Sequence, residues 1–346
     1  MVKNQAEEIR TYLLAKIPVH PKNIVAKASK AYACSRMTVH RHLNRLIRDG
    51  KIIKTGTTRQ VQYYLISEKN KEIIVSLRDG VVEEHKVWQE NFLKDFETLP
   101  QNILEICEYG FLEMLNNAID HSEGKAVVIS TEWEPDSVKI EFGDDGIGIF
   151  QKIKKTLSLE DERESALHLS KGKFTTDPEN HTGEGIFFTS RAFDDFYITS
   201  RGMAYRKDNV VEDWYIEKVK NSKFSGTGLA MEIALDSERK MQEVYNEYQQ
   251  EGSDGIEKFD KTHILVQLSM LGDERYVSRS QARRICLGLE KFKHVVLDFK
   301  NISTVGQGFV DEVFRVFQSK HPRIKITYTN ANDDVQFMIE RSLPVL

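Results

Sequence analysis

Apolar residues recur at helical spacing three times within residues 1–50, which predicts three short amphipathic helices. The repeating positions are Ile9, Leu13 and Leu14, then Ile24, Ala28 and Ala31, then Val39, Leu43, Leu46 and Ile47. Ser35 and Thr38 stand where a helix N-cap belongs, and Asp49-Gly50 is typical of a helix end. Residues 51–66 then read as two strands around a polar turn at Gly56–Arg59.

Three helices followed by a hairpin are the layout of a winged helix-turn-helix, which we expect at residues 1–66. Residues 1–65 hold thirteen Lys and Arg against three Asp and Glu, an excess of +10, although the whole chain has a net charge of −4. The cations concentrate on the third helix and the hairpin, so we expect DNA binding there, with protein docking as the alternative. The candidate DNA-binding residues are Arg36, His40, Arg41, Arg45, Lys54 and Arg59.

The length of 346 residues suggests two or three domains, at roughly 150 residues per domain. Residues 67–94 begin with a charged stretch and then read as helix through Trp88 and Phe92, so we expect a helical linker. A second linker is expected at residues 237–260, where Gln249–Gly255 favours a flexible turn. The two linkers would leave a middle domain at residues 95–236 and a C-terminal domain at residues 261–346.

The composition indicates a folded protein and argues against several classes of protein. Hydrophobic residues make up 40% and charged residues 29% of the chain, so a sizeable core can form. Cys34, Cys107 and Cys286 lie far apart, which indicates neither a zinc site nor a disulfide framework. No apolar run approaches the roughly 20 residues that span a bilayer, and the N-terminus does not read as a signal peptide. We therefore expect a cytoplasmic protein.

Four polar motifs follow one another between residues 100 and 235. Residues 111–121 read as helix, in which Glu113, Asn117 and Asp120 fall at i, i+4 and i+7 and share one face. The glycine turn at residues 182–185 predicts the start of another helix, and the backbone amides at the N-terminus of a helix can bind phosphates. The motifs in chain order are Glu113 to Asp120, Gly143-Asp144-Asp145-Gly146-Ile147-Gly148, Thr182-Gly183-Glu184-Gly185 and Ser225-Gly226-Thr227-Gly228.

This order of motifs resembles the GHKL ATPase superfamily, which includes gyrase-type topoisomerases, mismatch-repair ATPases, a heat-shock chaperone and histidine kinases. The resemblance covers about residues 95–235 and implies a GHKL α/β sandwich (Bergerat fold) that binds ATP with Mg²⁺. It makes Glu113 the general base that activates water and Asn117 the ligand of magnesium. Asp144 becomes the acceptor of the adenine amino group.

The same resemblance assigns the remaining cofactor-binding residues. Gly146 and Gly148 would give the backbone room at the base, and Thr227 would support the water network around adenine. Gly183 and Gly185 would lie at the phosphates. The ATP lid would fall within residues 169–177, where Lys171 or Lys173 could reach the γ-phosphate, and Asp120 completes the set.

The recipient of the γ-phosphate stays open at this point, because phosphoryl transfer needs only a metal, backbone donors and a positioned nucleophile. A classical P-loop is absent from the sequence. Histidine kinases carry a phosphoacceptor histidine just upstream of this domain. His85 occupies that region but lacks the usual surrounding pattern, so we interpret it as an ordinary helix residue.

Strands and helices alternate in the C-terminal stretch, which predicts a small sheet with helices packed on it. The expected elements are strands at 264–268, 295–299 and 324–329 and helices at 280–292, 308–317 and 335–341. Val277–Arg284, Leu297–Phe299 and Gly306–Glu312 resemble the STAS domain of anti-sigma antagonists, and more closely the STAS-like domain behind GHKL ATPases in bacterial proteins. Gly306-Gln307-Gly308 stands where antagonists carry their phosphoacceptor serine.

The expected fold class is therefore α/β and α+β multidomain, with a winged helix-turn-helix, a GHKL domain and a STAS-like α/β domain. The expected function is ATP-dependent regulation of transcription, with DNA and a protein partner bound by the two outer domains. An anti-sigma-type serine/threonine protein kinase and an ATP-sensing interaction module without turnover are the alternatives. A homodimer is compatible with the sequence, which does not fix the oligomeric state.

Overall fold

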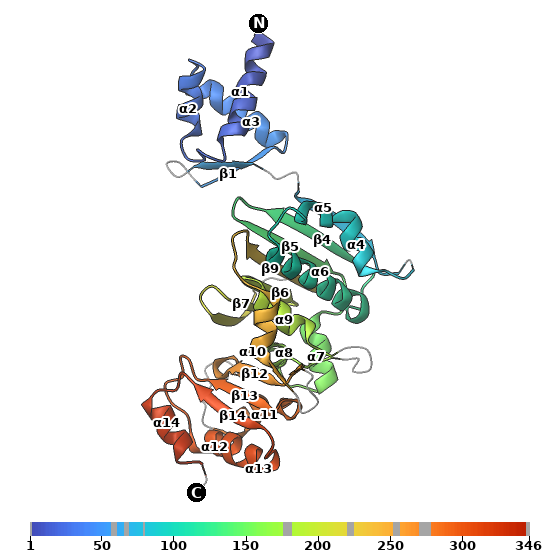
Figure 1. Cartoon of the computed structure of the whole chain (residues 1–346), viewed down its shortest axis with the longest axis vertical. Helices are drawn as coiled ribbons and strands as arrows, with labels where there is room; N and C mark the ends of the chain where they lie inside the picture. Colours follow the sequence, from blue (N-terminus) through green and yellow to red (C-terminus); the bar gives the residue numbers. More distant parts are fainter. Residues whose placement is uncertain are drawn as a thin grey trace. The chain divides into compact units, whose positions relative to one another are not determined.

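A computed structural model describes residues 2–56, 61–65, 69–78, 80–175, 182–219, 225–251, 257–269 and 278–343 (Figure 1). The chain forms two compact units, Met1–Glu72 with Ser130–Val138 and Ile73–Ile129 with Lys139–Leu346. Helices and sheets occur in both, so the protein has a mixed α/β fold. None of the described helices is both long and apolar enough to cross a bilayer.

The N-terminal unit contains the three helices and the hairpin that the hydrophobic pattern predicts. Its elements are α1 (Val2–Lys16), α2 (Ile24–Ala31), α3 (Arg36–Arg48), β1 (Ile52–Thr55) and β2 (Gln62–Leu65). The Ser35 hydroxyl accepts a hydrogen bond from the Thr38 amide at 3.1 Å, which confirms the predicted N-cap of α3. The antiparallel hairpin places Ile52 opposite Leu65. One core joins all five elements: Ile9, Leu13, Ile17, Ile24, Ala28, Val39, Leu43, Leu46, Ile52 and Tyr63.

The prediction of a helical linker at residues 67–94 is wrong for its first part. Residues Lys71–Ser76 form strand β3, because the β-branched run Ile73-Ile74-Val75 favours extended backbone. The helical part is correct, since α4 (Glu84–Asn91) and α5 (Leu93–Phe96) follow. Trp88 is fully buried, with its ring centroid 4.9 Å from that of Phe111, so this segment contributes to the core.

A seven-stranded sheet organises the middle of the chain, in the order β3-β4-β5-β9-β6-β7-β8. Its further strands are β4 (Ala126–Trp133), β5 (Ser137–Asp144), β6 (Asp195–Ser200), β7 (Met203–Asp208), β8 (Asp213–Lys218) and β9 (Thr227–Ala234). Every second residue of β5 is buried, as the pleat of a strand packed on one face requires.

Further helices of the larger unit lie beyond α5 in the chain (Figure 1). The first of these are α6 (Gln101–His121), α7 (Ile149–Leu157), α8 (Glu162–Lys171), α9 (Gly185–Ala192) and α10 (Met241–Tyr248). Helix α6 packs on the sheet through Phe111, whose ring centroid lies 5.4 Å from that of Phe142 on β5. Helix α9 lies beside α6, so the first turn of α9 adjoins the middle of α6.

Residues 237–260, predicted as a linker, contain ordered elements. Met241, Val244 and Tyr248 recur at helical spacing and are buried, which explains why α10 forms there. The predicted flexible turn begins instead with strand β10 (Gln249–Glu251), paired with β11 (Glu257–Phe259). Residues 252–256 lie outside the described residues.

The C-terminal part confirms the predicted alternation of strands and helices. Strands β12 (Lys261–Leu265), β13 (His294–Asp298) and β14 (Lys325–Thr329) run parallel in that order. The helical elements are α11 (Arg279–Cys286), α12 (Gln307–Val310), a π-helix at Asp311–Phe317, α13 (Gln318–Lys320) and α14 (Asp333–Glu340), with short 3₁₀ turns at Val266–Ser269 and Leu289–Lys291. The helix predicted to reach residue 292 ends at Cys286, because Gly288 adopts a left-handed conformation with φ +85°.

Candidate functional site

Seven of the predicted site residues line one cavity of about 320 Å³, within the 300–1,000 Å³ range of small-molecule sites. Four separate segments supply them: α6, the end of β5 with the following loop, the start of α9 and the start of β9. The seven are Glu113, Asn117, Asp144, Gly148, Gly183, Gly185 and Thr227. Residues up to 114 positions apart in the chain therefore meet at one site.

Helix α6 contributes Glu113 and Asn117 from successive turns. The Asn117 side-chain amide nitrogen donates to the Glu113 carbonyl at 2.8 Å. This bond fixes the amide, so its oxygen is the atom that remains to accept from a ligand or to bind a cation. Asp120, predicted to share this face, is exposed and lies outside the cavity. The cavity extends further along α6, where Ala118, His121 and Ser122 line it, so at this end of the helix another face than that of Asp120 borders the site.

Asp144 is held in a fixed orientation at the end of β5. Its side chain is buried, and its Oδ1 accepts hydrogen bonds from the Gly146 amide at 2.8 Å and the Thr227 amide at 3.2 Å. Burial raises the pKa of Asp144, while these hydrogen bonds lower it. The Thr227 hydroxyl in turn accepts from the Ile149 amide at 3.0 Å, which ties β9 to the start of α7. The carboxylate is thus positioned before any ligand arrives.

The predicted role of Gly146 is corrected by its position, because Gly146 does not line the cavity. A Cβ built on this residue would lie 2.0 Å from the Ser122 carbonyl oxygen. The glycine is therefore required by close packing against the end of α6 and not by the space that a ligand needs. Gly148, by contrast, does border the cavity.

The first turn of α9 meets the carboxylate of Glu113. A Cβ built on Gly185 would lie 2.1 Å from Oε2 of Glu113, so the absence of a side chain at residue 185 lets this carboxylate approach the helix. The unpaired amides at a helix N-terminus attract negative charge. Glu184 also lines the cavity, and burial raises its pKa.

Lys171 and Lys173 lie away from the cavity, which corrects their predicted placement at a nucleotide. The Lys171 ammonium group is buried and donates to the carbonyls of Arg284 and Leu287, at 2.9 Å each. Lys173 pairs with Asp260 at 3.1 Å. The last carbonyls of α11 have no partners within their own helix, and Lys171 satisfies two carbonyls at this end. Only Gly172, between the two lysines, borders the cavity.

One cation at this site was not predicted from the sequence. Lys152 on α7 lines the cavity, donates to the His121 carbonyl at 2.8 Å and pairs with Glu123 at 3.2 Å. Its position four residues after Gly148, on the helix that follows the Asp144–Gly148 motif, is the signal that could have found it. Among the described lining residues Lys152 is the one lysine or arginine, against three carboxylates, Glu113, Asp144 and Glu184.

The candidate nucleic-acid interface lies on α3 and β1 of the N-terminal unit. The buried face of α3 contains Val39, Leu43 and Leu46. The predicted contact residues Arg36, His40, Arg41, Arg45 and Lys54 are all exposed. Arg45 makes a 3.6 Å ion pair with Asp49 on the same surface, a contact that is weak between exposed groups. Arg59 falls outside the described residues.

Comparison with protein families identifies the C-terminal part. Residues 281–336 match a family model described as "STAS-like domain of unknown function (DUF4325)". This range runs from α11 through β13 and β14 into α14. No curated protein matches the chain. The chain therefore carries a STAS-like domain at its C-terminus, as the sequence resemblance predicted.

Proposed function

We propose that this protein is a Mg²⁺-ATP-dependent, DNA-binding regulator, in which a GHKL-type site controls the docking of a winged helix-turn-helix and a STAS-like domain. The observation that carries the proposal is the convergence of four sequence motifs on one cavity. Each motif alone is weak evidence for a nucleotide site, because glycine and polar residues are common in turns and helices of many proteins. Their meeting around a cavity of suitable size supports a single ligand that touches all four.

Asp144 is the residue that suits the adenine end of the ligand. Its Oδ1 is occupied by two backbone amides, which leaves Oδ2 as the acceptor for an exocyclic amino group. A carboxylate that accepts from a ligand donor in a buried site contributes about 1.5–3 kcal/mol. Phe142 and Leu229, which also line the cavity, provide the apolar surface that a base needs.

The charges of the lining support a requirement for a divalent cation. Three carboxylates and one lysine would repel a triphosphate unless a cation accompanies it. No group of three His, Cys, Asp or Glu side chains in the described residues could hold a metal alone. Magnesium fits this donor set, since it usually takes one or two protein oxygens, several waters and the phosphates of its substrate. Asn117 would supply the amide oxygen, and the bound ion would neutralise charge on the phosphates.

Glu113 is the candidate general base. Its carboxylate lies against the N-terminal turn of α9, where the phosphates would accept backbone hydrogen bonds. From this position Glu113 would orient a water molecule and accept its proton as the water oxygen bonds to the terminal phosphorus. The bond from this phosphorus to the bridging oxygen would break, and ADP would leave with that oxygen. General base catalysis of this kind contributes about 10²–10⁴-fold in rate.

The contacts of Lys171 and Lys173 support coupling between the nucleotide and the C-terminal domain. Gly172 borders the cavity, while Lys171 donates to the Arg284 carbonyl and Lys173 to the Lys291 carbonyl, both in the C-terminal part. Thr262 on β12 also donates to the Lys171 carbonyl at 2.7 Å. A ligand that moves this segment must change these contacts, and the population of docked states would shift accordingly.

The N-terminal unit is the proposed DNA-binding part. A helix whose apolar face is buried and whose exposed face carries Arg36, Arg41 and Arg45 has the form of a recognition helix for the major groove. Arginine donors suit both phosphates and guanine edges. Lys54 on the hairpin adds a cation for the DNA backbone.

The proposal is tested by phosphate release from ATP with the purified full-length protein, with and without Mg²⁺. Glu113→Gln is the test variant. Glu105→Gln, which changes an exposed carboxylate on the same helix outside the cavity, is the matched control. We expect magnesium-dependent turnover in the wild type and the control, and loss of turnover with retained ATP binding in Glu113→Gln.

Equal turnover in both variants would contradict the assignment of Glu113. ATP binding without phosphate release by the wild type would contradict hydrolysis and favour transfer to a protein or a switch without turnover. No ATP binding at all would contradict the nucleotide site itself.

A further inference from the structure

A second cavity of about 860 Å³ lies in the larger unit, where the end of the seven-stranded sheet meets the C-terminal domain. Strands β7 and β8 and helix α10 form one wall, and strand β12 with the loops that follow β13 and β14 forms the other. Parallel strands bind ligands beyond their carboxyl ends, and three parallel strands end at this cavity. None of the predicted nucleotide-site residues lines it.

Lys207 is buried in the wall of this cavity and forms no ion pair with a described carboxylate, and only the longer-range attraction of Glu212 and Glu247 favours its charge. Its side chain is 7% exposed. No carboxylate of the described residues lies within ion-pair distance of its Nζ, which has instead the Trp214 ring centroid at 5.2 Å. Burial and the neighbouring Arg191 lower the pKa of Lys207 to about 8. A buried ammonium group without a partner is costly, so an anion in the cavity would stabilise it.

Arg191 adds a second buried cation beside the same tryptophan. Its guanidinium carbon lies 4.9 Å from the Trp214 ring centroid, and its side chain is 4% exposed. The terminal nitrogens donate to the carbonyls of Phe187 and Ser170 and to the Ser190 hydroxyl. The Nε has no hydrogen-bond partner among the described residues. The Nε is also shielded from the cavity, so Arg191 has a structural role at the end of α9 and contributes its positive charge, not a free donor, to the cavity wall.

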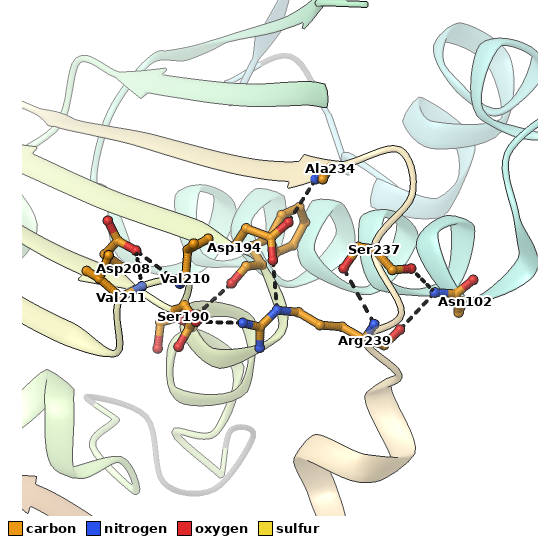
Figure 2. A network of polar contacts seen from close by, with 11 residues as sticks. Asn102, Ser190, Asp194, Asp208, Val210, Val211, Ala234, Ser237 and Arg239 are labelled. Atoms are coloured by element: carbon orange, nitrogen blue, oxygen red, sulfur yellow. Dashed lines mark hydrogen bonds and ion pairs between the residues drawn. The ribbon is translucent and has the colours of Figure 1, made fainter. Parts of the chain in front are cut away.

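The other charged groups around the cavity have partners. Arg239 pairs with Asp194 at 2.8 Å, and Figure 2 shows this carboxylate between the Arg239 guanidinium and the Ala234 amide. Lys240 pairs with Glu243 at 3.2 Å. The remaining carboxylates do not form ion pairs with Lys207.

Asp298 is the most buried of these carboxylates, and its own contacts satisfy it. It accepts from the Lys300 amide at 2.8 Å and from the Asn330 side chain at 2.9 Å, and His263 lies 3.3 Å from its second oxygen. Glu212 and Glu247 are exposed at the rim. The unsatisfied charge of the cavity wall is therefore positive and concentrated at Lys207 and Arg191.

We propose that this second cavity binds a small organic anion, whose phosphate or carboxylate group is held by Lys207, with the positive charge of Arg191 beside it. The volume exceeds what a bare oxyanion needs, and the Trp214 and Tyr248 side chains offer an aromatic surface to the rest of the molecule. Because the walls come from the large sheet and from the STAS-like part, such a ligand would bridge the two. The site would thus serve as a sensor of a metabolite distinct from the nucleotide.

The test uses the full-length protein and two probes, inorganic phosphate and citrate, titrated separately in a buffer free of both. Calorimetry measures the affinity, and Trp214 fluorescence reports on the cavity, since this ring neighbours both cations. Lys207→Met is the test variant. Lys218→Met removes an exposed lysine on the neighbouring strand β8 and is the matched control. We expect at least one probe to bind, with about tenfold or greater loss of affinity in Lys207→Met only.

Helix α9 borders both cavities, because Phe187 lines the first and its ring lies 3.4 Å from the Arg191 guanidinium carbon. A variant of the first cavity is therefore needed to show which cavity binds the probe, and Asn117→Ala is suitable because Asn117 lines only the first. Affinity that falls in Asn117→Ala and is unchanged in Lys207→Met would place the probe in the first cavity and overturn the proposal. Absence of binding by both probes would overturn it as well. Circular dichroism and the melting temperature of each variant show whether the fold is retained, and Trp214→Phe checks the origin of the fluorescence signal.

Discussion

The carboxylate of Glu113 occupies the space that a side chain would take at Gly185, with Oε2 only 2.1 Å from the position of a Cβ on that glycine. The two residues are 72 positions apart in the chain and belong to α6 and α9. This contact holds the candidate base at the N-terminus of a helix, where phosphates would also bind. The geometry of the proposed reaction therefore depends on a glycine that has no chemistry of its own.

Gly185→Ala is expected to displace the Glu113 carboxylate and to lower ATP turnover by about tenfold or more, because a base outside hydrogen-bond reach loses its contribution. The protein should still fold, since a flexible side chain can move away from the new methyl group. Steady-state phosphate release measures the effect.

Gly143→Ala is the matched control for this glycine, because a Cβ there would meet nothing within 4 Å. Its turnover should equal that of the wild type. Full activity in Gly185→Ala would show that the position of Glu113 in this structure is not the one used in the reaction.

The double variant Arg41→Ala, Arg45→Ala should weaken DNA binding by about tenfold or more at low salt, because each arginine that contacts a phosphate releases counterions. The dependence of affinity on salt should become shallower, while ATP affinity stays the same. Fluorescence anisotropy with a labelled duplex at several salt concentrations measures both quantities.

Lys27→Ala with Lys30→Ala removes the same charge from exposed positions on α2 and serves as the comparison. Equal losses in the two double variants would indicate that only the net charge of the unit matters. Unchanged affinity in the α3 variant would remove the recognition-helix assignment.

The buried Lys171 should make stability depend on pH. Burial lowers its pKa to about 7, against a value near 10.4 in an unfolded chain. Between these values the unfolded state binds a proton that the folded state lacks, so the free energy of unfolding rises with pH. The contribution is at most about 1.4 kcal/mol per pH unit.

Lys171→Met should lose this contribution. The slope of the unfolding free energy against pH between 7 and 10 should then fall by about 1.4 kcal/mol per pH unit, the value for uptake of one proton on unfolding. Denaturant titrations at several pH values, followed by tryptophan fluorescence, give the slope. Lys155→Met, at an exposed position, should retain the wild-type slope. An identical slope in Lys171→Met would mean that this lysine keeps its proton in the folded state.

Local patterns predicted most of the elements, and the errors have identifiable physical causes. Apolar spacing found α1, α2 and α3, and alternation with turns found β12, β13 and β14. Strand β3 was missed because its charged flanks concealed a β-branched run. Helix α10 was missed because the glycines that follow it suggested a flexible joint. Strand β3 is ordered by pairing with β4, and α10 by burial of its apolar face, and local composition reports neither of these tertiary contacts.

The residues of the candidate site also divide into those that local patterns predicted and those whose place depends on tertiary contacts. The motifs found Glu113, Asn117, Asp144 and Gly185, since their spacing reflects one helix face and two tight turns. The lysines near residue 172 were misplaced because the C-terminal domain competes for their ammonium groups, and such tertiary contacts have no signal in the local sequence. The burial of Lys207 gave no signal in the sequence either, because it depends on tertiary contacts such as that with the Trp214 ring.

In the proposed function Asp144 recognises the base of a nucleotide. The most direct test is calorimetric titration of full-length protein with Mg²⁺-ATP, comparing Asp144→Asn with Asp145→Asn. Both carboxylates accept two backbone amides, but Asp145 binds those of Lys125 and Ala126 outside the cavity. Loss of at least about tenfold in affinity for Asp144→Asn, with Asp145→Asn unchanged, is the predicted result. Equal affinity of wild type and Asp144→Asn would contradict the account.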